Sequence, residues 1–328
     1  MSSVTIGKYE IGTGKPCFII TDAGVNHNGS FELAKKLVDV AVEAGVHCVK
    51  FQTFKAKGVV TESGGMATYQ KKNMGQEESQ VAMLKKYELD YDDFRRLKEY
   101  CDEKGIMFAS TPHSADAVDF LDPLMLFYKI GSGDVTNIPL LKSVAKKGKP
   151  IMLSVGMANI AEIREAVECV YAEGNKQIVL LHCTTSYPCP LNAVNLRVME
   201  TMRKEFPEIP IGYSDHTEGI EVAKLAAAEG AVVVEKHHTT DKSLPGPDHV
   251  ASLSPEELKN LVKDITSGDL STSLDRELVL GSSEKVLLPI EVDCARIARK
   301  SVVSLVDIPE GTVITEEMLA IKRPEMGL

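Results

Sequence analysis

The feature that most constrains the fold of this chain is a regular alternation of apolar runs with helical stretches. Continuous apolar runs, each followed by a stretch of helical periodicity, are typical of parallel sheets that are covered on both faces. Roughly 250 residues of this alternation predict a (β/α)₈ barrel of the TIM type, and a doubly wound open sheet is the alternative. No GxGxxG motif follows the first run, which disfavours the dinucleotide-binding form of that alternative. The runs cover residues 17–22, 46–52, 106–111, 126–134, 150–157, 177–188, 209–216 and 231–238.

The chain divides into a predicted barrel and a short C-terminal part. The alternating pattern fills residues 1–268, and a Ser- and Asp-rich segment at 269–298 is predicted to be a linker with some helical content. Residues 299–328 have a β-like apolar pattern with a turn at 309–311 (PEG). This last segment is too short to bury a core of its own, so we expect it to pack on another surface.

Polar residues at the ends of the apolar runs share one face of their predicted strands. Because side chains alternate along a strand, Lys50 shares a face with Gln52, and Glu235 shares one with His237, while Lys236 points the other way. We expect the polar faces to converge at the mouth of the barrel, where such folds place their chemistry. The group also contains Asp22, Lys129, Ser132, Ser154, Ser214 and His216.

Lys50 and Lys129 are informative because the chain is acidic. Its 37 Lys and Arg against 47 Asp and Glu give a net charge of −10, which disfavours a general nucleic-acid or anionic-membrane surface. Two lysines among hydroxyl groups and backbone amides suit a phosphate or carboxylate ligand. The sequence therefore predicts a local anion site in an acidic protein.

His216 and His237 end neighbouring predicted strands, and each can give one nitrogen to a divalent ion. Two histidines are too few for a structural zinc site, which usually has four protein ligands. They suit an open site that water and substrate oxygens complete, for example a Mn²⁺ site. Hydrogen-bonded buried imidazoles are the alternative. His238 has the opposite parity and is not expected to be a ligand, and His113 is expected to be an ordinary loop residue.

Several longer motifs stand at these strand ends and near the C-terminus. They are GVNHNGS, VKFQTFKA, YQKKN…ESQ, STP, YKIGSGDVTNIPL, LLHCTTSYP, GYSDHTEGIE, EKHHTTDKSLPGPDH and ARKSVV…IPEGTVIT…KRP. In this order they resemble the N-acetylneuraminate synthase family, the phosphoenolpyruvate-condensing enzymes that make sialic, legionaminic and related nonulosonic acids. The resemblance extends from about residue 16 to the C-terminus, and it is closer to the legionaminate and sialate branches than to the pseudaminate branch.

The resemblance implies a (β/α)₈ barrel followed by a small antifreeze-like (SAF) domain, in a domain-swapped homodimer. It implies a transferase that joins phosphoenolpyruvate to N-acetylmannosamine or 2,4-diacetamido-2,4,6-trideoxy-mannose, with C–O cleavage and release of phosphate. His216 and His237 would hold a metal that polarises the sugar aldehyde, with Mn²⁺ expected and Mg²⁺ or Co²⁺ as alternatives.

The resemblance also implies roles for individual side chains. Phosphoenolpyruvate would be bound by Lys50, Thr111, Lys129, Ser132, Ser154 and Ser214. Gln52, Tyr187 and Asp248 would contact the sugar. Asp134 and Thr185 are further substrate-binding candidates, and Asp134 is expected to bear on the choice of sugar. Arg323 would reach in from the partner subunit to the N-acyl group, and Asp22 would help to place or deprotonate water.

This sequence departs from the family pattern at several positions. Asp22 stands where most members have Glu, and Asp134 stands where some sialate synthases have Glu. His113 and His238 stand where Phe is usual. The chain stops at KRPEMGL where relatives continue, so we expect a partial SAF domain at 299–328.

The cysteines, the N-terminus and the length of the apolar runs bear on where in the cell the protein is located. The seven cysteines lack CxxC spacing, the N-terminus lacks a secretory pattern, and no apolar run approaches the roughly 18–20 residues of a transmembrane helix. We expect free thiols and a cytoplasmic protein without membrane or nucleic-acid partners.

Two other function hypotheses remain open at this stage. One is another barrel enzyme that uses phosphoenolpyruvate or an aldehyde, such as a 3-deoxy sugar-acid synthase or a Schiff-base aldolase. The other is a catalytically weakened glycan-binding or assembly protein, motivated by Asp22 and by the short C-terminal segment.

Overall fold

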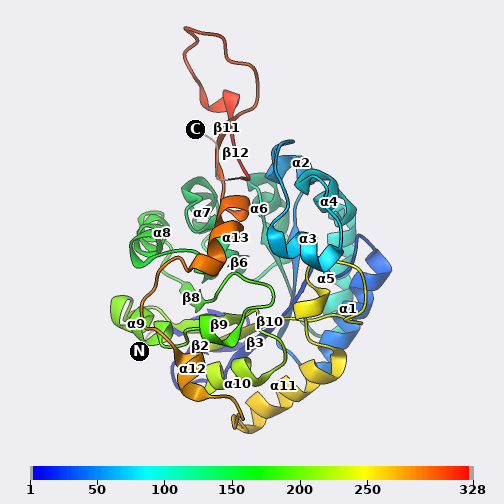
Figure 1. The fold of residues 1–328 in the computed structure, drawn as a ribbon, viewed down its shortest axis with the longest axis vertical. Helices are drawn as coiled ribbons and strands as arrows, with labels where there is room; N and C mark the ends of the chain where they lie inside the picture. Colours follow the sequence, from blue (N-terminus) through cyan, green and yellow to red (C-terminus); the bar gives the residue numbers. More distant parts are fainter. Residues whose placement is uncertain (1–2, 325–328) are drawn as a thin grey trace.

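The computed structural model describes residues 3–324 and contains a ring of eight parallel strands (Figure 1). The order around the ring follows the chain: each strand pairs with the next, β10 pairs with β3, and contacts between β5 and β6 complete the ring. The predicted (β/α)₈ barrel is thus confirmed, and the open-sheet alternative is wrong. The strands are β3 (Phe18–Gly24), β4 (Cys48–Thr53), β5 (Met107–Pro112), β6 (Tyr128–Ile130), β7 (Ile151–Ser154), β8 (Ile178–His182), β9 (Ile211–Asp215) and β10 (Val233–His237).

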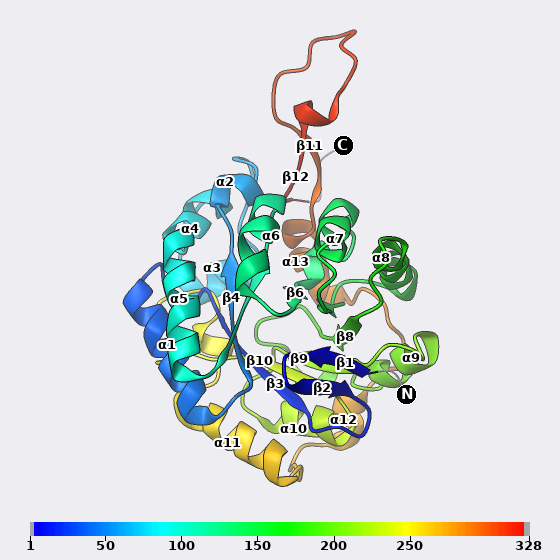
Figure 2. The ribbon, with the colours of Figure 1, turned by 180° about the vertical axis from the view of Figure 1, so that it is seen from behind.

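Helices cover the outside of the ring (Figure 2). The first one begins at the predicted N-cap, where Ser30 Oγ accepts a hydrogen bond of 3.3 Å from the Leu33 amide, and it ends at Gly45 in the left-handed conformation. No described helix has the length and apolar content needed to cross a membrane. The helices up to the end of the barrel are α1 (Phe31–Ala44), α2 (Ala56–Val59), α3 (Thr68–Met74), α4 (Gln80–Lys86), α5 (Tyr91–Lys104), α6 (Ala115–Leu121), α7 (Ile138–Ala145), α8 (Ile160–Ala172), α9 (Val198–Glu205), α10 (Glu221–Ala228) and α11 (Pro255–Ser267).

An N-terminal hairpin is present that the sequence analysis missed. Strands β1 (Ser3–Ile6) and β2 (Tyr9–Gly12) are antiparallel, and their apolar side chains are buried in the main core. Gly7, in the turn, lies against Met107 and Leu126 at the start of β5 and just before β6. The hairpin therefore closes the amino end of the barrel, opposite the carboxyl ends where function is expected.

The segment after the barrel packs back onto its mouth. It contains α12 (Arg276–Leu280) and α13 (Val292–Ala298), and the Glu291 carboxylate accepts hydrogen bonds of 3.0 and 2.8 Å from the amides of Met157 and Thr185. The predicted linker thus holds the loops that follow β7 and β8.

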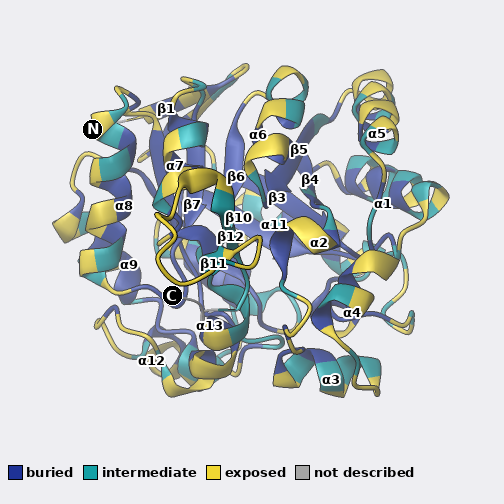
Figure 3. Ribbon diagram, turned by 90° about the horizontal axis from the view of Figure 1, so that it is seen from above, coloured by how far each residue is buried: buried dark blue, intermediate teal, exposed yellow. Residues whose placement is uncertain are grey.

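Residues beyond α13 form an antiparallel hairpin of β11 (Ser301–Ser304) and β12 (Leu319–Lys322). Figure 3 shows this hairpin and α13 above the mouth of the ring, with an exposed loop between the two strands. The loop exposes large apolar side chains, and Val313 is 82% exposed.

Lys236 lies on the outer face of the ring, as its parity predicts. Its Nζ is 2.7 Å from Asp215 Oδ2, and both side chains have 0% exposure. Lys236→Met would leave the Asp215 carboxylate buried and unpaired, so we expect the free energy of unfolding to fall by about 3–5 kcal/mol. Urea denaturation followed by circular dichroism measures this loss.

The control for Lys236→Met is an exposed ion pair. Lys147 Nζ lies 2.7 Å from Asp119 Oδ1, whose side chain is 71% exposed. Lys147→Met should cost less than about 1 kcal/mol. Equal costs for the two variants would contradict the stabilising role assigned to the buried pair.

Candidate active site

Four charged side chains meet inside the barrel at the carboxyl ends of its strands. Lys50 Nζ lies 2.7 Å from Asp22 Oδ2 and 3.9 Å from Glu235 Oε1, and Lys129 Nζ lies 3.3 Å from the same Glu235 oxygen. None of the four residues is more than 4% exposed. The strand register explains the cluster, because Asp22 is level with Lys50 on one side and with His237 on the other. The predicted convergence of the polar faces is confirmed.

The protonation states of this cluster follow from its geometry. Burial acts to raise the pKa of Asp22, but the charges of Lys50 and His237 outweigh burial and lower the pKa to about 2. Burial also acts to lower the pKa of Lys50, which Asp22 and Glu235 overcome, so that this pKa is raised. Burial lowers the pKa of Lys129, and Glu235 offsets this only in part. A further anion beside Lys129 would therefore stabilise its charged form.

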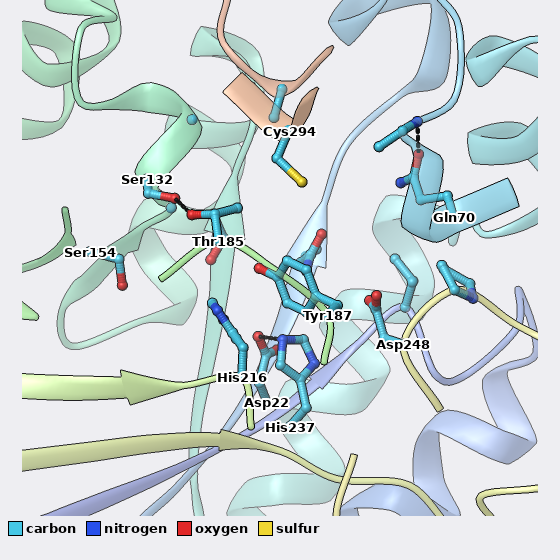
Figure 4. Close-up of a pocket in the computed structure, with 18 of the residues that line it drawn as sticks. Asp22, Gln70, Ser132, Ser154, Thr185, Tyr187, His216, His237, Asp248 and Cys294 are labelled. Carbon is cyan, nitrogen blue, oxygen red and sulfur yellow. Dashed lines mark hydrogen bonds and ion pairs between the residues drawn. The ribbon is translucent and has the colours of Figure 1, made fainter. Parts of the chain in front are cut away.

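Hydroxyl groups surround the two lysines. Thr111 Oγ1 accepts a bond of 3.4 Å from Lys50 Nζ, and Ser214 Oγ donates one of 3.3 Å to Glu235. Ser132 Oγ lies 3.2 Å from Thr185 Oγ1, while Ser154 Oγ is buried without a hydrogen-bond partner among the described residues (Figure 4). These donors and the lysines form a site suited to a phosphate or carboxylate group.

The two predicted metal ligands lie side by side. The rings of His216 and His237 are 5.8 Å apart between centroids, and the Tyr187 ring lies 4.2 Å from the His216 ring at an interplanar angle of 39° (Figure 4). His216 Nδ1 lies 2.8 Å from the Thr184 carbonyl oxygen, which leaves the other ring nitrogen free. His237 Nε2 lies 3.3 Å from Asp22 Oδ2, and its Nδ1 is buried with no hydrogen-bond partner within residues 3–324.

This pair fits an open metal site. Burial and the neighbouring His237 lower the pKa of His216 to about 3, so its ring is neutral at physiological pH, as a metal ligand must be. The described residues contain no group of three or more His, Cys, Asp and Glu side chains placed to hold a metal ion. A closed structural site is thereby disfavoured, and a site completed by water or substrate oxygens remains consistent with the geometry.

The same pocket is lined by further polar and apolar side chains. The polar ones include Gln52, Tyr187, Asp248 and Arg323. Burial raises the pKa of Asp248. The Arg323 Nε atom is buried without a hydrogen-bond partner in the described structure. The apolar ones include Val25, Met83, Leu84 and Tyr87, which belong to one buried cluster.

Comparisons with known proteins identify the family of this chain. A model of the NeuB family matches residues 37–274, which is more than half of the chain. This chain belongs to the NeuB family. It is 45% identical to a Legionella pneumophila protein named N,N'-diacetyllegionaminic acid synthase, across 97% of this chain and 88% of that protein. It is 39% identical to human N-acetylneuraminate-9-phosphate synthase, across 95% of this chain and 84% of the human protein.

A solved structure shares the fold along nearly the whole chain. The spore coat polysaccharide biosynthesis protein SpsE of Bacillus subtilis superposes with a TM-score of 0.83 at 33% identity, covering 98% of this chain and 88% of that chain. The barrel and the segment that follows it are therefore both represented in a relative of the NeuB family.

Most of the predicted site residues line one pocket, but Asp134 does not. The pocket wall contains Asp22, Lys50, Gln52, Thr111, Lys129, Ser132, Ser154, Thr185, Tyr187, Ser214, His216, His237, Asp248 and Arg323. Asp134 is 1% exposed and lies behind this wall, where its Oδ1 is bound by Lys300 Nζ and Asn137 Nδ2, each at 2.8 Å. Asp134, which was expected among the substrate-binding residues, is therefore not part of the described pocket lining.

Arg323 also differs from what the family resemblance implies. That resemblance brings the residue from a partner subunit, whereas here Arg323 lines the pocket of its own chain. Its amide donates a bond of 2.8 Å to the Val59 carbonyl, and its own carbonyl accepts one of 3.0 Å from the Thr61 amide. These bonds attach the end of the hairpin beside α2.

His113 and Lys300 are pocket-region residues that the sequence analysis did not select. His113 lines the pocket, its Nδ1 lies 3.6 Å from Asp134 Oδ2, and burial lowers its pKa to about 4. Its placement as an ordinary loop residue is therefore corrected. The available signal was its position directly after β5, where the other strands also end in polar residues. For Lys300 the signal was a lysine within the ARKSVV motif.

Proposed function

We propose that this protein condenses phosphoenolpyruvate with an N-acyl amino sugar of the mannose type, forming a nonulosonic acid and phosphate. The observation that carries this proposal is the placement of Lys50 and Lys129 in the same pocket as the pair His216 and His237. The lysines suit the anionic substrate, and the same pocket contains the two histidines and further polar and apolar side chains. The relatives named as legionaminic and sialic acid synthases support the same reaction.

The chemistry requires one new carbon–carbon bond and one broken carbon–oxygen bond. The enol carbon of phosphoenolpyruvate attacks the sugar aldehyde, water adds to the adjacent cationic carbon, and the tetrahedral intermediate expels phosphate with its bridging oxygen. Lys50 and Lys129 neutralise the anionic substrate. Ser154 Oγ, which has no hydrogen-bond partner in the part of the chain that the structure describes, can donate to it. Fixed charges of this kind in a closed site supply a large part of catalysis.

We assign Asp22 a positioning role in this reaction. With a pKa of about 2 its carboxylate is a weak base at neutral pH. Its contacts with Lys50 and His237 instead fix two groups that face different substrates. Glu235 Oε2 is buried without a partner in the described structure and is placed to hold a water molecule in the cluster.

The proposed condensation also includes a divalent metal ion. His216 and His237 would hold a divalent ion, for which we propose Mn²⁺ with Mg²⁺ or Co²⁺ as alternatives. When bound there, the ion supplies Lewis-acid polarisation of the aldehyde oxygen. The neutral His216 ring and its hydrogen bond to Thr184 are consistent with such a ligand.

The assembly that we propose is a homodimer in the cytoplasm. The loop between β11 and β12 exposes Leu305, Val306, Val313 and Ile314, each more than half exposed. Apolar side chains gathered on one loop favour contact with a second copy of the chain. The seven free cysteines are consistent with a reducing compartment.

The charged side chains that line the pocket favour an acceptor sugar without a phosphate group. Apart from histidines, the cationic side chains that line the described pocket are Lys50, Lys129 and Arg323, and the two lysines are committed to phosphoenolpyruvate. Condensation adds the three carbons of phosphoenolpyruvate to the sugar, so carbon 6 of the sugar becomes carbon 9 of the product. A 9-phosphate product therefore requires a 6-phosphorylated sugar. Here the pocket wall offers Val25, Met83, Leu84 and Tyr87 together with the acidic Asp248.

We therefore expect kcat/KM for N-acetylmannosamine to exceed that for its 6-phosphate by at least about tenfold, because a buried phosphate would lack a dedicated partner. The 2,4-diacetamido-6-deoxy sugar, with its apolar methyl group, should be the best of the three. Steady-state kinetics with these acceptors measures the order, and a preference for the 6-phosphate would contradict it.

Sugar-dependent phosphate release tests the reaction itself. Purified protein is incubated with phosphoenolpyruvate and a panel of amino sugars, with EDTA or with added Mn²⁺. The proposal predicts release that needs both substrates and a metal. Inactivation by borohydride in the presence of substrate, with no effect of EDTA, would instead indicate a Schiff-base aldolase. Sugar binding without release would indicate the glycan-binding alternative.

A further inference from the structure

A buried ion pair joins the C-terminal hairpin to the mouth of the barrel. Lys300 Nζ lies 2.8 Å from Asp134 Oδ1, and both side chains are 2% exposed. The same nitrogen donates a bond of 2.7 Å to the His113 carbonyl. Lys300, the residue before β11, thus connects the hairpin with the loops that follow β5 and β6.

The strand pairing of the hairpin links the position of Lys300 to the position of Arg323. Ser301 pairs with Lys322 in the antiparallel ladder, so Lys300 and Arg323 leave the base of the hairpin on adjoining strands. Ser301 Oγ also donates a bond of 2.6 Å to the Pro324 carbonyl. Lys300 and the backbone bonds of Arg323 to Val59 and Thr61 are therefore two separate attachments of one hairpin base.

Asp134 is also fixed from its own side. Asn137 Nδ2 donates to Asp134 Oδ1 at 2.8 Å, within the turn η2 (Ser132–Asp134) and the start of α7. A Cβ atom on Gly133 would lie 2.9 Å from the Ala298 carbonyl oxygen, so the turn and the end of α13 are in close contact. The Asp134 carboxylate is therefore held in a fixed position, where it pairs with Lys300.

We propose that Lys300 and Asp134 are a positioning pair that holds Arg323 at the sugar side of the pocket. This inference rests on the sugar-binding role proposed for Arg323. The pair touches neither substrate itself, because Asp134 lies behind the pocket wall and Lys300 is enclosed by Asp134 and His113. It sets acceptor affinity through the hairpin and leaves the phosphoenolpyruvate site unchanged.

The kinetic test removes both charges at once, so that neither is left buried alone. The double variant Asp134→Asn, Lys300→Met should stay folded, since replacing both members of a buried pair is often neutral. Its KM for the sugar should rise at least about tenfold, the effect of losing roughly one charged hydrogen bond. Its KM for phosphoenolpyruvate should change less than about threefold, within the range of a surface substitution. Lys300→Arg, which keeps the charge, should retain most of the sugar affinity.

A double-mutant cycle with Arg323→Ala shows whether the pair acts through that residue. If it does, the pair substitutions add no further rise in sugar KM once Arg323 is alanine. Additive effects, or equal rises in KM for both substrates, would overturn the proposal and would indicate a direct contact or a general structural role.

Hydrogen exchange tests the attachment without any substrate. In the Asp134→Asn, Lys300→Met variant, amides of 319–323 should exchange faster than in the unsubstituted protein, while those of β9 and β10 stay protected. Unchanged exchange at 319–323 would overturn the inference. This readout stands apart from the proposed reaction, whose own failure would appear as absent phosphate release in the unsubstituted protein.

Discussion

His237→Ala is expected to lower sugar-dependent phosphate release by about 1,000-fold or more, because several kcal/mol of metal-derived stabilisation would be lost. The residue lies at the barrel mouth, with its ring beside His216 and Asp22. It does not belong to the packed apolar layers, so the fold should survive its truncation. Binding of Mn²⁺, followed by electron paramagnetic resonance, should weaken in parallel.

The control is the adjacent histidine on the opposite face of the strand. His238 Nδ1 lies 2.8 Å from Thr21 Oγ1 and its Nε2 lies 3.0 Å from the Leu37 carbonyl, away from the pocket. His238→Phe, which introduces the residue usual in the family, should cost about 1–3 kcal/mol of stability through lost hydrogen bonds. It should keep kcat and Mn²⁺ affinity. An unfolded His237→Ala variant, or one with normal metal affinity, would support the alternative of a buried structural histidine.

Lys129→Met is expected to reduce kcat/KM for phosphoenolpyruvate by about 100-fold, since a charge-assisted contact in a buried site contributes roughly 2–3 kcal/mol. Lys129 is 2% exposed and its nearest anionic partner is Glu235 at 3.3 Å. KM for the sugar should change little. The matched control is Lys236→Met, which removes a buried lysine from the outer face and should affect stability more than phosphoenolpyruvate binding.

The pH profile gives a second readout for Lys129. Burial lowers its pKa from the ordinary lysine value of 10.5. The charged form binds the anion, so kcat/KM for phosphoenolpyruvate should fall as pH rises through this lowered pKa. Lys129→Arg keeps its charge to higher pH and should move the alkaline loss upward. An unchanged alkaline limb in Lys129→Arg would show that another group controls it.

The barrel and its inner cluster could be predicted from sequence because both follow from short-range rules. Each predicted run overlaps one strand of the ring, although the runs at 126–134, 150–157 and 177–188 extend past the ends of β6, β7 and β8. The period of two placed Lys50 and Glu235 inside and Lys236 outside. The amino-terminal hairpin was missed because its strands have four residues each, Ser3–Ile6 and Tyr9–Gly12, too short for periodicity to separate from a loop. The alternation of Val4 and Ile6 before Gly7 was the available signal.

The corrections concern residues whose roles depend on distant parts of the chain. The contacts of Asp134 are set by Lys300, which arrives with the C-terminal segment. The local sequence around Asp134 or Lys300 does not specify this contact. Arg323 lines the pocket from the hairpin of its own chain, and local sequence does not specify whether the hairpin covers its own barrel or a partner's. His113 was misjudged as a loop residue, although its position directly after β5 was the signal for its place in the pocket.

The most direct test of the central claim is a crystal structure with phosphoenolpyruvate and Mn²⁺ and without sugar, so that no turnover occurs. We expect the phosphate and carboxylate groups of phosphoenolpyruvate to lie against Lys50 and Lys129. We also expect an anomalous manganese peak bonded to ring nitrogens of His216 and His237. Phosphoenolpyruvate bound away from the two lysines, or manganese on other side chains, would contradict it.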